Sequence, residues 1–240
     1  MTSFKQRQAA ASNWRGDTRH RMEELLEGFK QHLSGQGEKL TFPLDIDRLI
    51  EQYLCLGYRI VPLAEEFPSP CETPSDRFWG CLHNSPREKG WTVFLDENLV
   101  EQGRDGPVSF SAAHEVAHYT LDVPPGERNG DQLCLELPGI SEGYPRILCR
   151  ARDARSFTER RADYAAACLL APAREVCEAF RSWKQDEGLP PDLRLTPEER
   201  GLYWRAIYAL AEKFGVSATA MSIRFDELDL ARREGQMLLT

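Results

Sequence analysis

The 240-residue chain is predicted to be an α+β protein that is mostly helical and carries one small antiparallel sheet. Apolar residues recur at helical spacing in several segments, the pattern of helices that bury one face. Two short segments, Arg77–His83 and Trp91–Leu95, flank a turn-rich stretch and predict a β-hairpin. The composition, 41% apolar and 28% charged, is that of a globular protein, so we expect these elements to share a core.

The segments ahead of the hairpin predict two helices and a strand. Residues 17–33 have apolar side chains at helical spacing and are followed by two glycines. Residues 44–56 repeat this pattern and are followed by Gly57. Residues 58–62 are expected to form a short strand, and the proline-rich, acidic stretch 63–76 an irregular loop.

Four helices are expected after the long stretch 122–155, which contains proline and glycine and is predicted to be a loop. Residues 156–170 and 173–183 predict two helices separated by Pro172. The capping-box sequence Thr196-Pro-Glu-Glu199 predicts the start of a third helix that ends near residue 214. Gly215 then introduces a turn and a last helix.

Charge, cysteine content and hydropathy together indicate a cytoplasmic protein. A formal net charge of −8 disfavours broad binding to nucleic acid. The 7 cysteines are scattered and form no CxxC pair, which is typical of reduced thiols. The N-terminal segment lacks the apolar stretch of a signal peptide, and no segment approaches the roughly 18 apolar residues of a membrane span. We therefore expect no membrane partner.

The motif His114-Glu115-x-x-His118 is the clearest chemical signal in the chain. Residues four apart lie on one face of a helix, so both imidazoles can bind one Zn²⁺ ion. Glu115 can then act as general base toward a water molecule. The surrounding stretch is rich in alanine and lies between Pro107 and Pro124, which favours a helix. Zn²⁺ is the expected cofactor, and Mn²⁺ is an accepted alternative for such ligands.

A catalytic zinc site needs a third protein ligand, for which Glu159 is the candidate. Glu159 and Asp163 stand four apart on the predicted helix 156–170, so their carboxylates face the same way. One can bind the metal, and the other can accept a hydrogen bond from the free ring N–H of a ligating histidine. The alternative is a solvated acidic pair that neutralises the two arginines between them. Asp122 is a rival ligand, but it lies about 12 Å from His114 along one helix.

Two stretches, Phe110–Leu121 and Glu159–Pro172, together resemble the ImmA/IrrE family of bacterial and phage metallopeptidases. The hairpin and Leu210–Phe225 match the family more weakly, and the resemblance covers about residues 44–230. It implies a zincin-like metallopeptidase with a C-terminal helix–turn–helix-like subdomain. It also implies cytoplasmic cleavage of a helix–turn–helix repressor, often in stress or mobile-element switches. The corresponding domains are an N-terminal helical extension (1–43), the metallopeptidase core (44–183) and the C-terminal helical subdomain (184–240).

By this resemblance His114, His118 and Glu159 are the metal ligands and Glu115 is the general base. Position 122 is often a histidine in the family and is Asp122 here. An additional donor should stabilise the oxyanion of the reaction, and the sequence offers four candidates. These are His83, Tyr119, Tyr144 and Tyr164.

The substrate is expected to be an extended peptide that adds a strand at an open edge of the sheet. Aromatic residues in the hairpin are interpreted as core on one face: Phe78, Trp79, Trp91 and Phe94.

Two other functions remain open. Leu210–Phe225 has the outline of a DNA-binding helix–turn–helix, but its second helix contains Arg224 as its one basic residue, so direct DNA binding is not expected. The other alternative is a metal-binding regulator or toxin–antitoxin component that cleaves nothing and acts through protein or DNA binding. Loss of function in a Glu115→Gln variant that retains its metal would identify an enzyme.

Overall fold

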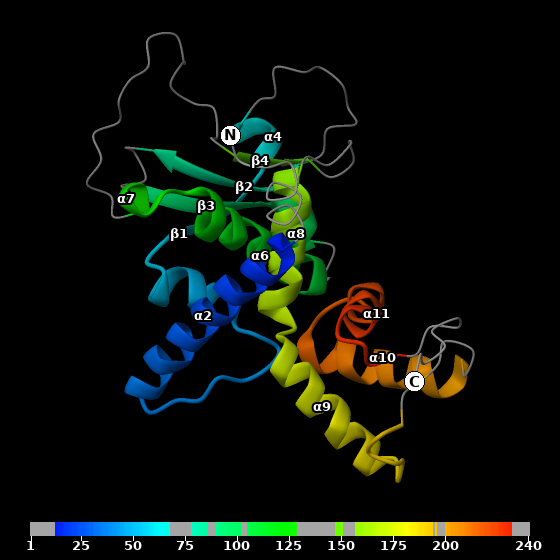
Figure 1. Ribbon diagram of the computed structural model, residues 1–240. Helices are drawn as coiled ribbons and strands as arrows, with labels where there is room; N and C mark the ends of the chain where they lie inside the picture. The colour runs from blue at the N-terminus through cyan, green and yellow to red at the C-terminus, as the bar shows by residue number, and fades with distance from the viewer. Residues whose placement is uncertain are drawn as a thin grey trace, which may run out of the picture.

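A small sheet lies above a group of helices in the computed structural model of this chain (Figure 1). The structure describes residues 13–67, 78–85, 90–101, 105–128, 147–150, 157–193, 195 and 200–231. These residues are mostly helical and form one mixed sheet, which confirms the predicted α+β class.

The sheet has four strands in the order β1-β3-β2-β4. The predicted hairpin is confirmed, because β2 (Phe78–Ser85) and β3 (Gly90–Asp96) pair antiparallel. The prediction of an antiparallel sheet was wrong at one edge, where β1 (Gly57–Val61) runs parallel to β3. A parallel pair needs a long crossover, and here the chain from β1 to β3 passes through β2.

The other edge strand, β4 (Ile147–Arg150), lies inside the stretch 122–155 that was predicted to be a loop. It pairs antiparallel with β2, and the register shifts between Phe78 and Cys81. Phe78 pairs with Arg150 and Cys81 with Leu148, so Trp79 and Gly80 oppose one residue of β4. This is a β-bulge, which locally re-aims the side chains of its strand.

The N-terminal elements agree with the sequence in position and differ in detail. The predicted helix 17–33 is α2 (Trp14–Gly35), which buries apolar side chains at helical spacing. The predicted helix 44–56 is shorter, with α3 (Ile46–Arg48) continuing into one π-helical turn, η1 (Leu49–Tyr53). Residues 63–76 were expected to be irregular but begin with α4 (Leu63–Glu66), and residues 68–77 lie outside the described part.

Two helices beneath the sheet, α6 (Asp105–Asp122) and α8 (Phe157–Leu170), pack against each other (Figure 1). Six alanines are buried on these helices: Ala112, Ala113, Ala117, Ala162, Ala165 and Ala166. Small side chains let two helices approach closely, so α6 and α8 can share one site. Two one-turn helices flank α6 and were missed, α5 (Glu97–Glu101) and α7 (Pro125–Arg128).

The last three helices are α9 (Ala173–Asp186), α10 (Arg200–Phe214) and α11 (Ala218–Glu227). They match the predicted helices, although the capping box at residues 196–199 lies outside the described residues. Gly215 connects α10 to α11 with φ of +64°, a left-handed conformation that glycine adopts without strain.

The described residues form two main apolar clusters that meet in the chain between Leu170 and Ala171. The first cluster contains the inward faces of α2, the sheet, α6 and α8. The second contains those of α9, α10 and α11. The division at residues 43/44 and 183/184 remains a prediction. Within the described ranges, no helix has both the length and the apolar character needed to cross a lipid bilayer.

Candidate metal centre

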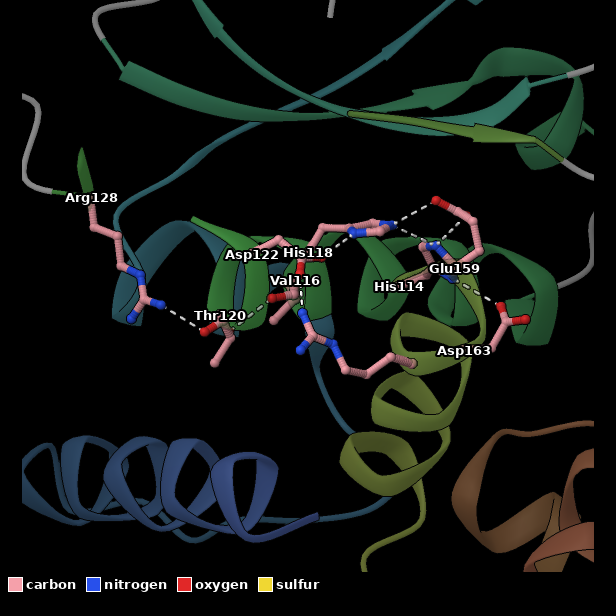
Figure 2. Close-up of polar contacts among 9 residues, drawn as sticks. His114, Val116, His118, Thr120, Asp122, Arg128, Glu159 and Asp163 are labelled. Atoms are coloured by element: carbon pink, nitrogen blue, oxygen red, sulfur yellow. Dashed lines mark hydrogen bonds and ion pairs between the residues drawn. The ribbon is translucent and has the colours of Figure 1, made fainter. Parts of the chain in front are cut away.

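The packing of α6 against α8 brings His114, His118 and Glu159 together (Figure 2). The two histidines lie one turn apart on α6, and their Nε2 atoms are 3.0 Å from each other. Glu159, in the first turn of α8, places one carboxylate oxygen 3.4 Å from His114 Nε2 and the other 3.5 Å from His118 Nε2. The three candidate ligand atoms lie within 4.8 Å of one another, a group able to hold a metal ion.

The outer ring nitrogen of each histidine faces a carboxylate. His114 Nδ1 is 3.0 Å from Asp163 Oδ1, and His118 Nδ1 is 2.8 Å from Asp122 Oδ2 (Figure 2). These contacts hold each ring in one orientation and favour the tautomer that carries its proton on Nδ1. Asp122, the rival third ligand, thus lies behind His118 and not beside the three ligand atoms.

Asp122 is itself oriented by an arginine from the neighbouring helix. Arg161 on α8 forms an ion pair with the carboxylate oxygen of Asp122 that does not face His118. The side chains of Arg161 and Asp122 are 27% and 16% exposed, so this pair is partly shielded from water. Arg161, which the alternative interpretation paired with the acids of its own helix, therefore links α8 to the histidine helix.

The three candidate ligand atoms of the centre favour a cation between them. With Nδ1 protonated, a neutral imidazole presents a lone pair on Nε2. Two such lone pairs and the Glu159 carboxylate converge, and all three are hydrogen-bond acceptors. His118 is fully buried and His114 is 6% exposed, so water does little to relieve the repulsion. A metal ion or added protons must occupy this point, and two imidazoles with one carboxylate suit Zn²⁺.

The pKa values of the two histidines and of Glu159 indicate that protons can take the place of a metal ion between these groups. Burial lowers the pKa of His114, but hydrogen bonds to Asp163 and Glu159 outweigh burial and raise it to about 9. Burial also lowers the pKa of His118, and hydrogen bonds to Asp122 and Glu159 raise it to about 9. Burial raises the pKa of Glu159, but the hydrogen bonds from both histidines bring it well below its ordinary value. Protons and a metal ion therefore compete for the same atoms.

Glu115 lies beside the cluster with its side chain fully buried against the sheet. A Cβ atom placed on Gly80 of β2 would lie 3.0 Å from Glu115 Oε1 and 3.3 Å from Glu115 Cγ. The absence of a side chain at position 80 therefore allows the strand to pass directly over this carboxylate. Glu115 is held between α6 and the β2 bulge, in a position from which it can exchange a proton with a molecule in the cleft.

A cleft of about 470 Å³ opens on the cluster between β2, α6, α8 and α11. His114, Glu115, Glu159 and Asp163 line it, whereas His118 lies behind them. Trp79 also lines the cleft and is 38% exposed, so its assignment to the core was wrong. It lies in the β-bulge, which re-aims its side chain, whereas Trp91 and Phe94 are buried as expected but belong to different apolar clusters.

None of the described candidates for the oxyanion donor lines this cleft. Tyr119 donates to the carbonyl of Arg128 at 3.4 Å, and the Tyr164 hydroxyl bonds to Glu227. The His83 ring contacts the aromatic rings of Phe67 and Phe94. Tyr144 lies outside the described residues. The described hydroxyl groups at the cleft surface belong to Ser111, Ser217 and Thr219.

Several residues of the centre were not identified from the sequence. Asp122 was considered only as a rival third ligand, although it follows His118 by four residues, the spacing that allows its contact with His118 Nδ1. No comparable signal marks Arg161, Gly80 or the α11 residues that line the cleft, because they reach the site through packing between distant segments.

Arg224, the one basic residue of the second helix in the possible DNA-binding pair, is 1% exposed and donates to the carbonyl of Ala171 at 2.8 Å.

Neither a protein-family model nor a curated protein matches the chain.

Proposed function

We propose that this protein is a cytoplasmic zinc-dependent endopeptidase of the ImmA/IrrE type that cleaves a helix–turn–helix transcriptional repressor. The observation that carries the proposal is the convergence of two imidazole nitrogens and one carboxylate beside a buried glutamate, with His114, Glu159 and Glu115 lining an open cleft. Two histidines, one glutamate ligand and a glutamate base are the set of groups that zinc-dependent peptide hydrolysis uses.

The residues of the chain divide the chemistry among them. His114, His118 and Glu159 would hold the ion, which when bound supplies Lewis-acid activation of a water molecule and of the scissile carbonyl. Asp163 and Asp122 keep the two imidazoles oriented through their Nδ1 atoms. Glu115 accepts the proton of the attacking water and delivers it to the leaving amine. The buried setting of Glu115 strengthens its electrostatic interactions with the reacting groups.

The choice of a protein substrate over DNA is supported by the lack of exposed basic residues on α11, the second helix of the α10–α11 pair. Arg224 points into the protein interior, where its Nη1 atom lies 2.6 Å from Glu227. A recognition helix needs basic or amide side chains on its outer face to reach phosphates and bases. The helix α11 contains no other basic residue, and its outer face has the exposed apolar residue Ile223.

The proposal is tested by co-expressing the protein with the helix–turn–helix repressor encoded nearest to it. Parallel cells carry Glu115→Gln, or Glu178→Gln as a control at an exposed glutamate outside the centre. We expect cleavage by the wild type and the control, and an intact repressor with Glu115→Gln that still holds zinc. A repressor that survives the zinc-loaded wild type, together with full biological function of Glu115→Gln, would favour a metal-binding regulator that does not hydrolyse peptides.

A further inference from the structure

The cleft extends beyond the metal cluster to a wall formed by α11 and the turn before it. Val216, Ala220 and Ile223 line this end, and Trp79 of β2 and Phe110 of α6 line the same cavity. Among the described lining residues, the titratable side chains all belong to the cluster itself. The α11 end of the cleft therefore has an apolar surface with hydroxyl groups and no charge.

Two large apolar side chains that line the cleft are exposed. Ile223 is 63% exposed and Trp79 is 38% exposed, although both line a cleft that also contains the buried side chains of His114 and Glu115. The cleft volume of about 470 Å³ is in the range of pockets that accept small ligands. Removing these surfaces from water on binding favours an apolar group in the ligand, because apolar burial is the main driving force of association.

Helix α11 has two distinct faces. Met221, Arg224 and Phe225 are buried against the rest of the C-terminal helices, whereas Ala220 and Ile223 face the cleft. This spacing is that of an amphipathic helix, except that its second apolar side is left without a partner among the described residues. An exposed apolar stripe at the edge of a catalytic cleft is the arrangement expected of a surface that binds substrate.

The apolar wall is held at a fixed distance from the metal ligands. Arg224 Nε donates to the carbonyl of Ala171, at the end of α8, over 2.8 Å. Glu227 of α11 contacts both Arg224 and the hydroxyl of Tyr164 on α8. Because α8 also carries Glu159, these buried and partly buried contacts fix α11 relative to the ligand cluster.

We propose that the α11 end of the cleft is a binding pocket for a large apolar side chain of the peptide substrate, next to the scissile bond, with Ile223 and Trp79 as its walls. This inference deepens the proposed peptidase function and rests on it. It predicts that the enzyme selects leucine, isoleucine, methionine or phenylalanine at that position and rejects charged residues, which would lose their hydration without gaining a partner.

The test measures binding, so that it does not depend on turnover. Two peptidyl hydroxamates that differ in one side chain, leucine or glutamate, are titrated into the zinc-loaded full-length protein. We expect the leucine compound to bind at least about tenfold more tightly. In Ile223→Arg this ratio should fall by about tenfold or more, since the new guanidinium attracts the glutamate side chain and removes apolar surface.

The control is Tyr208→Arg, which adds the same charge at an exposed aromatic residue on α10 outside the cleft. Equal binding of the two compounds to the wild type, or the same ratio in both arginine variants, would overturn the pocket. A wild type that prefers the leucine compound but hydrolyses no peptide would support the pocket and overturn the peptidase proposal. Failure of the protein to bind zinc would overturn both.

Discussion

The two carboxylates behind the histidines are predicted to contribute unequally to zinc affinity, with Asp122→Ala more damaging than Asp163→Ala. Asp122 faces the Nδ1 atom of His118, a residue with no exposed surface. Asp163 faces His114 and lines the cleft. Water from the cleft can therefore replace the lost acceptor at His114, whereas Asp122 is only 16% exposed and does not line the cleft, so water replaces its carboxylate less readily.

The expected loss of zinc affinity in each variant follows from the role of Asp122 and Asp163 as acceptors that orient the histidines. Removing an acceptor that orients a ligating histidine weakens metal binding by about 10- to 100-fold, or about 1.4 to 2.8 kcal/mol. We place Asp163→Ala at the lower end, because its side chain is 24% exposed. Asp122→Ala belongs at the upper end, because it also leaves the guanidinium of Arg161 without its anion near a site that must accept a cation.

The assay is a competition titration against a chromophoric zinc chelator at fixed pH, with the exposed Glu178→Ala variant as control. Thermal unfolding of each metal-free variant shows whether the fold is retained. The reasoning is refuted if Asp163→Ala weakens zinc binding as much as Asp122→Ala, or if neither variant differs from the control. A further variant, Arg161→Met, should lie between the two, since it retains the Asp122 carboxylate without its orienting partner.

Three other predictions concern protons and the sheet. Zinc binding at pH 7 should release protons, because the metal displaces them from the pair of His114 and His118, whose pKa values are raised. Calorimetry in buffers of different ionisation enthalpy measures this release. Without metal, the raised pKa values stabilise the fold below pH 6.5, and this contribution is lost as the pH rises through 9, so the melting temperature should fall in that interval with EDTA and much less with zinc. Gly80→Ala should lower kcat/KM by about tenfold without changing zinc affinity, because the new methyl group presses on Glu115; unchanged peptide hydrolysis would contradict the close approach of β2.

The helices and the hairpin could be predicted because their signals are local. The apolar periodicity of α2, α8 and α9, and the turn between β2 and β3, depend on residues close in the chain. The parallel pairing of β1 and the presence of β4 could not be read in this way. Strand β4 has 4 residues, too few for alternation to show, and the position of β1 in the sheet depends on a long connection.

The candidate ligands could be proposed from spacing alone, since His114, His118 and Glu159 occupy helix positions whose geometry is known in advance. The groups that orient and cover them come from tertiary packing. Gly80 lies over Glu115 because a strand crosses the helix there, and Ile223 reaches the cleft because α11 is tied to α8. Neither relationship leaves a periodic pattern in the sequence.

The two faces of α11 differ in how substitutions there affect the protein. A substitution at Ala220 or Ile223 alters the cleft wall, whereas Met221, Arg224 and Phe225 keep the helix attached to the protein. Under the proposed function, new cleavage preferences can therefore evolve through single replacements on one side of a helix, with the candidate metal centre and its supporting framework inherited unchanged.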